Sequence, residues 1–186
     1  MEGMIKGYSV LASGQFITDD RALCQCVPEQ TLDAIATHRS TIKPGEWYPR
    51  SEVLLLWRAI ADAGGDEKGA YENLIRCGEF NANRAAGTFL KLLLKMLTPR
   101  TFAKKFSDFW AHDHRGGQVA VEQLDAKNLL IEIRDIAGFD HVAVISAGFI
   151  GFTLRATGLK SLTAHTSSWS RQKPGPEKVK IEVSWQ

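Results

Sequence analysis

Hydrophobic and polar residues alternate strictly near the end of the chain, from Lys178 to Trp185. Successive side chains of a strand point to opposite faces, so this alternation predicts a strand with one covered face and one wet face. Similar patterns and intervening turn residues predict further strands at 119–124, 129–136 and 162–169, in addition to this one at 178–185. The last third of the chain therefore predicts a four-stranded antiparallel sheet.

A long apolar stretch lies between the second and third of these strands. Residues 140–157 are too hydrophobic for an exposed helix, which predicts a buried crossover helix. Its small residues, Ala147, Gly148 and Gly151, permit another backbone to approach closely. Residues 116–186 thus read as two strands, a helix and two strands.

The first part of the chain carries helical periodicity instead. A short extended segment is expected at 4–12, and one broken or two short helices at 19–38, interrupted near Pro28. A helix begins near Pro49 and ends at Gly64-Gly65, and Asp66 caps the next one. Residues 88–97 are apolar on most sides and predict a buried helix, and Thr98-Pro99 opens a helix with an aromatic face made by Phe102, Phe106, Phe109 and Trp110.

These elements predict an α+β fold: an N-terminal helical half packed on a C-terminal four-stranded antiparallel sheet with one buried crossover helix. At 186 residues the chain is expected to form a single domain, with residues 1–115 as the mainly helical half and 116–186 as the ββαββ half.

Composition narrows the classes of function. The net charge is only +2, which argues against a nucleic-acid partner. No secretory signal and no apolar run long enough to span a bilayer are visible, and three cysteines suit a reducing compartment. A cytoplasmic location is therefore expected.

Candidate metal ligands are few. Cys24-x-Cys26 is half of a zinc pattern without a second half, so small buried thiols are the favoured interpretation, for Cys77 as well. His112-Asp113-His114 carries donors suited to a divalent ion, but a solvated helix C-terminus explains the histidines better. No metal site is therefore expected.

Catalytic signatures are also missing. The sequence has no nucleophile elbow, phosphate-binding loop or His-Glu-x-x-His motif, and a non-enzymatic protein is expected. A run of basic residues is interpreted as a solvated face rather than a phosphate site: Lys91, Lys95, Arg100, Lys104 and Lys105.

Trp47-Tyr48-Pro49-Arg50 is the best candidate for ligand binding. Trp47 and Tyr48 could line a cavity at a loop-to-helix junction, with Arg50 at its mouth. A hydrophobic staple on the following helix explains the two rings equally well.

Several short motifs carry a family resemblance that covers nearly the whole chain. They are Lys6-Gly7, Trp47-Tyr48-Pro49, Thr98-Pro99-Arg100, Gly148-x-x-Gly151 and Val183-Ser184-Trp185. Together they resemble a family of uncharacterised bacterial proteins. That family is distantly similar to the superfamily of haem-based nitric-oxide sensor (H-NOX) domains, vinyl-reductase domains and Golgi-transport TRAPP subunits. The resemblance implies a helical half on a four-stranded sheet that holds hydrophobic or tetrapyrrole-like ligands or forms assemblies.

Departures from the superfamily shape the cofactor expectation. The haem sensors carry Tyr-x-Ser-x-Arg where this chain reads Ile131-Glu132-Ile133-Arg134-Asp135, and no histidine lies in 89–97, before the proline corner. The closing hairpin, 165–169, lacks the cysteines usual in vinyl-reductase domains. No cofactor is therefore expected, and haem is disfavoured, with no histidine-dependent Soret band.

Two functions remain open on this basis. The leading hypothesis is a non-enzymatic cytoplasmic sensory or adaptor domain that binds a small apolar ligand and signals through a protein partner. The alternative is a ligand-free assembly module that dimerises through an apolar helix, as transport-complex subunits do. An enclosed apolar cavity would favour the first, and a filled interior with an exposed apolar patch the second.

Overall fold

The computed structural model describes residues 3–85, 98–135, 140–166, 169 and 178–186, and the helix predicted at 88–97 lies outside them. Apart from α1, which the sequence does not predict, the described helices follow the predicted order. They are α1 (Gly7–Asp19), α2 (Arg21–Cys26), α3 (Glu29–Thr41), α4 (Ser51–Asp62), α5 (Glu67–Ala85), α7 (Pro99–Asp113) and α8 (Asp140–Ala156). The predicted cap of α7 is confirmed, because Thr98 Oγ1 accepts a hydrogen bond from the Thr101 amide at 3.1 Å.

The predicted C-terminal sheet is confirmed. Its strands are β4 (Gln118–Gln123), β5 (Asn128–Arg134), β6 (Thr163–His165) and β7 (Lys178–Ser184), all antiparallel in the order β4-β5-β7-β6. Along β7, Val179, Ile181 and Val183 are buried and the residues between them are more exposed, as the alternation predicts. β6 is shorter than expected, since its strand geometry ends at His165.

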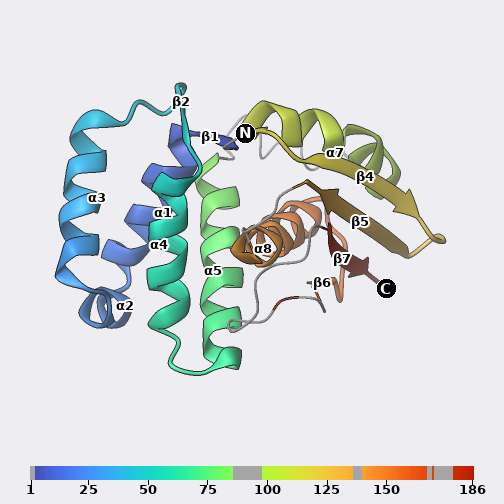
Figure 1. Cartoon of the computed structure of the whole chain (residues 1–186). Helices are drawn as coiled ribbons and strands as arrows, with labels where there is room; N and C mark the ends of the chain where they lie inside the picture. The colour runs from blue at the N-terminus through green and yellow to red at the C-terminus, as the bar shows by residue number, and fades with distance from the viewer. Residues whose placement is uncertain (1–2, 86–97, 136–139, 167–168, 170–177) are drawn as a thin grey trace.

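Helix α8 lies between the sheet and the helical half (Figure 1). Two glycines make its contact with α5 very close. A Cβ atom on Gly148 would meet the Ile75 carbonyl oxygen at 2.2 Å, and one on Gly78 would meet the Ile145 carbonyl oxygen at 2.1 Å. The close approach expected from the small residues of this helix is thus confirmed at Gly148.

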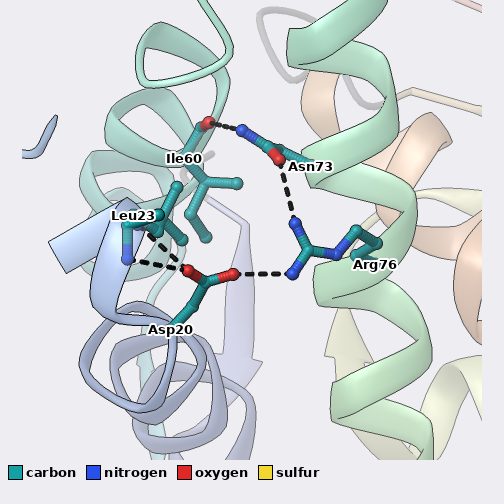
Figure 2. A network of polar contacts seen from close by, with 6 residues as sticks. Asp20, Leu23, Ile60, Asn73 and Arg76 are labelled. Carbon is teal, nitrogen blue, oxygen red and sulfur yellow. Dashed lines mark hydrogen bonds and ion pairs between the residues drawn. The ribbon is translucent and has the colours of Figure 1, made fainter.

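A polar network joins α2, α4 and α5 (Figure 2). Asp20 caps α2 by accepting the amides of Ala22 and Leu23, and it pairs with Arg76 of α5 at 2.6 Å. Arg76 also donates to Asn73, whose amide donates to the Ile60 carbonyl of α4. These contacts set the positions of α2, α4 and α5 relative to one another.

The N-terminal segment differs from the prediction. Only β1 (Met4–Lys6) is extended, and α1 begins directly at Gly7. β1 lies in the middle of a second sheet, between β2 (Trp47–Pro49) and β3 (His114–Arg115). The expected extended segment at 4–12 is therefore too long, and Pro49 ends a strand instead of opening α4. Pairing with strands distant in the sequence decides this geometry.

Candidate ligand-binding site

A large cavity of about 720 Å³ opens between α1, the C-terminal end of α5, α7 and α8. Its walls are mainly apolar and include Phe102, Phe106, Phe109 and Phe149. Arg84, an exposed residue, also lines it. A cavity of this size, with aromatic walls and few polar groups, is typical of small-molecule sites.

A small cavity of about 60 Å³ adjoins the large one. The two share five lining residues: Tyr8, Phe106, Phe109, Asp113 and Phe149. Three other side chains that line the small cavity, Asn81, Trp110 and His114, each bury a polar atom that has no hydrogen-bond partner within the described part of the chain. The unpaired atoms are Asn81 Oδ1, an acceptor, Trp110 Nε1, a donor, and His114 Nδ1. Leaving such atoms unpaired is costly, so they favour a polar guest, either water or part of a ligand.

Buried hydrogen bonds around Ser13, called the hub below, fix the position of the Asn81 side chain. Ser13 Oγ of α1 accepts hydrogen bonds from Asn81 Nδ2 at 3.1 Å and from Trp57 Nε1 at 3.0 Å. Cys77 lies against the same hydroxyl, and burial raises the pKa of its thiol to about 12. The hub orients Asn81, so that its amide nitrogen is occupied while its oxygen is free to accept from a guest.

Asp113, at the end of α7, forms hydrogen bonds with two other side chains that line the large cavity. It accepts hydrogen bonds from the Tyr8 hydroxyl and from His112 Nδ1, the latter at 2.7 Å. Burial, and next the Asp113 charge, raise the pKa of Tyr8, so the phenol remains protonated and donates. The Tyr8–Asp113 contact ties the first turn of α1 to the last turn of α7 across both cavities.

The expectation that His112 and His114 both lie at a solvated helix C-terminus is right for His112 only. His112 is exposed at the end of α7, as a solvated helix terminus predicts, but His114 belongs to β3 and stacks on Trp110, with ring centres 3.9 Å apart. Burial, and then the charge of Arg50, lower the pKa of His114 to about 3. The imidazole is therefore neutral, and its buried Nδ1 has no partner among the described residues.

The residues singled out as a ligand site lie elsewhere. Trp47 and Tyr48 belong to β2, and Tyr48 Oη accepts from the Lys43 amide at 2.9 Å. Arg50 is only 1% exposed and donates to the carbonyls of Arg115 and Gly116, so it fastens β3 from within. None of the three is among the described residues that line either cavity. Ligand binding by Trp47, Tyr48 and Arg50 stays a prediction.

The cysteine expectation is right for Cys77 alone. Cys77 is buried, whereas Cys24 is partly buried and Cys26 is exposed on α2. Within the described ranges, no three His, Cys, Asp or Glu side chains gather as a metal site. No helix of the described part is long and apolar enough to cross a membrane.

The sequence pattern indicates one wall of the site but not the site itself. Phe102, Phe106 and Phe109 were recognised as one helix face, without the cavity beside it. Tyr8, Asn81 and Phe149 carried no motif, and they line cavities only because α1, α5 and α8 meet there.

Comparison with known proteins defines the class of fold. No family model matches the chain, and neither does any curated protein. Among solved structures, a mutant of an Fe(II) unliganded H-NOX protein from K. algicida is 14% identical, with a TM-score of 0.65 over 98% of this chain and 97% of that one. An oxygen-binding H-NOX domain related to soluble guanylate cyclases is 11% identical, with a TM-score of 0.63 over 98% and 95% of the two chains. The chain therefore has the H-NOX-like fold.

A third similar structure corrects the cofactor expectation. It comes from work on modulating haem redox potential through protein-induced porphyrin distortion, and it is 12% identical, with a TM-score of 0.64 over 97% of this chain and 99% of that one. The expectation of no cofactor, with haem disfavoured, is thus wrong as a conclusion from two short motifs. The missing motifs were too local a criterion, because the whole chain takes the fold of proteins studied with haem and Fe(II).

Proposed function

We propose that this protein is a non-enzymatic sensory domain that holds a flat, mainly apolar ligand in the two adjoining cavities and signals through protein contacts. The observation that carries the proposal is the large cavity of about 720 Å³ with four phenylalanines in its walls. The alternative function, a ligand-free assembly module, would require a filled interior, in contrast to this cavity. The large apolar side chains exposed on the described part, Leu55, Phe109 and Leu124, lie on three separate segments of the chain.

The residues present fit haem as the ligand. The apolar walls suit a porphyrin face, and Arg84, which donates to the Gln15 side chain, brings to the cavity a guanidinium that would pair with a carboxylate of the ligand. His112 lines the same cavity, and its Nδ1 is engaged by Asp113, which leaves Nε2 as the atom that would hold iron. Bound haem would supply an iron centre able to bind a small molecule.

The chain's own residues explain how occupancy would be sensed. Asn81 and Trp110 offer one acceptor and one donor to the polar part of a guest in the small cavity. Tyr8 and Asp113 line both cavities and bond to each other, so a guest that moves either side chain shifts α1 relative to α7. The binding energy of the guest would thereby favour one arrangement of these two helices.

Absorption titration with haemin and with metal-free protoporphyrin IX tests the proposal. We expect both to bind stoichiometrically and to quench tryptophan emission. His112→Ala should weaken haemin binding at least tenfold and leave protoporphyrin binding unchanged, because only iron needs the imidazole. His165→Ala, on β6 outside both cavities, is the matched control and should bind both like the natural chain.

Two results would count against the proposal. Failure of both compounds to bind would exclude a tetrapyrrole ligand. Equal haemin binding by the natural chain and His112→Ala would remove His112 from its proposed role. Phe109→Ala, at a partly exposed residue that lines both cavities, should weaken both compounds and so shows whether they occupy this site.

A further inference from the structure

Two cations contact one indole ring on the face of the small sheet that is opposite to the buried Ile5. Ile5 is buried, so its neighbour Lys6 points to the opposite face of β1, where Trp47 is its cross-strand partner. Lys6 Nζ lies 4.2 Å from the centre of the Trp47 ring, and Arg115 Cζ lies 4.3 Å from it. Both distances are within the range of favourable cation–π contacts. Lys6, Trp47 and Arg115 are called the cation–indole face below.

Neither cation of this face has a carboxylate partner among the described residues. Lys6 Nζ donates to the Gly45 carbonyl at 2.7 Å, which leaves its charge uncompensated. Arg115 is exposed and contacts the Trp47 ring without an ion pair in the described part. Two like charges are thus held against one ring, an arrangement that an anion stabilises.

The position of the face is fixed from behind. The buried Arg50 donates to the carbonyls of Arg115 and Gly116, and β1 pairs with both β2 and β3. Its charged groups are therefore placed before any partner arrives, which lowers the entropic cost of binding.

We propose that the cation–indole face is the docking surface for an acidic, extended segment of a partner protein. Charge complementarity selects carboxylates, and the ring offers flat apolar area for their side-chain stems. β2 is an edge strand of its sheet, so an extended segment can lie along it. A nucleic acid fits less well, because it rewards many spread cations and the whole chain carries a net charge of only +2.

The face is connected to the cavities through the backbone. Tyr8 and Asp113 line both cavities and form a hydrogen bond with each other. Lys6 is two residues from Tyr8, and Arg115 is two residues from Asp113. A guest that separates Tyr8 from Asp113 would move Lys6 relative to Arg115 and change the affinity for the partner. This coupling rests on the proposed function, whereas the docking itself does not.

Fluorescence anisotropy with a labelled ten-residue glutamate-rich peptide tests the docking. We expect salt-sensitive binding, absent for the glutamine counterpart, and an affinity at least tenfold weaker in Lys6→Gln/Arg115→Gln. Arg100→Gln/Lys104→Gln removes the same charge from exposed positions of α7 and should bind like the natural chain. The exposed single variant Arg115→Gln, expected to lose at least threefold, replaces the double variant if the latter does not fold.

Three outcomes of the binding experiments would overturn the docking proposal. Equal loss in the α7 control would mean non-specific attraction, and no loss in either face variant would exclude the face. Tighter, face-dependent binding of phosphatidylserine vesicles or of a short RNA would make a membrane or a nucleic acid the partner instead. Repeating the peptide titration with protoporphyrin-loaded protein separates the two hypotheses, because unchanged affinity contradicts only the coupling.

Discussion

At the scale of single residues, glycine determines how closely α5 and α8 pack. Gly78 and Gly148 each face a carbonyl oxygen of the opposite helix at a distance that no Cβ atom tolerates. Gly151, one turn further along α8, meets only side-chain atoms, at 3.5 Å or more. Two glycines of the same helix thus have different roles, although the sequence presents them alike.

Gly148→Ala should destabilise the protein by about 3 kcal/mol, because the added methyl group forces the two backbones apart. Gly151→Ala is the matched control and should change stability by less than about 1 kcal/mol, since alanine also favours a helix. Urea unfolding of the two variants measures both effects. Equal stability of the variants would show that α5 and α8 are not in such close contact.

His114 predicts a dependence of stability on pH. Its pKa is lowered to about 3 in the folded protein, against about 6.5 in an unfolded chain. The unfolded state therefore binds more protons between these values, so stability is full above pH 6.5 and is lost as the pH falls toward 3. His141, whose pKa is lowered to about 4 mainly by burial, acts in the same direction.

The natural chain should lose about 1 kcal/mol through His114 between pH 7.5 and 5.5, and His114→Phe, which keeps a ring against Trp110, should lose that much less. The free energy of unfolding in urea at both values measures the difference. The same slope in His114→Phe would mean that His114 is not held neutral.

At the scale of elements, Asp20 has two separable roles. Its carboxylate caps α2, and it pairs with Arg76 of α5 (Figure 2). Hydrogen bonds from the Leu23 amide, followed by Arg76, lower the pKa of Asp20. Asparagine retains the cap and loses the charge, while alanine loses both.

Asp20→Asn should therefore cost less than about 1 kcal/mol, since the pair is partly exposed. Asp20→Ala should cost about 1 kcal/mol more, the value of a helix cap. Thermal melts of the two variants give the difference. If the asparagine variant were as unstable as the alanine variant, the ion pair would matter more than the cap.

Elements with local signals could be predicted from the sequence. The alternation in β7 and the Thr98-Pro99 start of α7 need no distant partner to be recognised. The local pattern does not show where β1 ends and α1 begins. That boundary depends on pairing with β3, where Met4 and Ile5 have their partners at Arg115 and His114, far along the chain. The local pattern also does not show that Arg50 is buried. Its carbonyl acceptors, on Arg115 and Gly116, are distant in the sequence. The cavities depend in the same way on four helices that meet.

At the scale of the whole molecule, α8 belongs to both halves. It packs on α5 on one side and on β6 and β7 on the other (Figure 1). Neither half can bury its apolar face without it. The expectation of a single domain over residues 1–186 therefore becomes a prediction about cooperativity.

Helical circular dichroism and tryptophan emission should report one thermal transition with a common midpoint. Trp57 lies in the helical half and Trp185 follows β7, so the emission samples both halves. Trp57→Phe leaves two tryptophans in each half, Trp47 and Trp110 in one and Trp169 and Trp185 in the other, and should give the same midpoint as circular dichroism of that variant. Two midpoints would divide the chain into separate domains.

The pairing of Ile5 with His114 also has a consequence for the order of events during synthesis. At roughly 5–20 residues per second, β1 leaves the ribosome on the order of ten seconds before β3 exists to pair with it. Closing so long a stretch of chain is entropically unfavourable until other contacts have shortened it. The Tyr8–Asp113 contact must wait for the same closure. The chain therefore completes the walls of its two cavities late during synthesis, after most of its helices have been made.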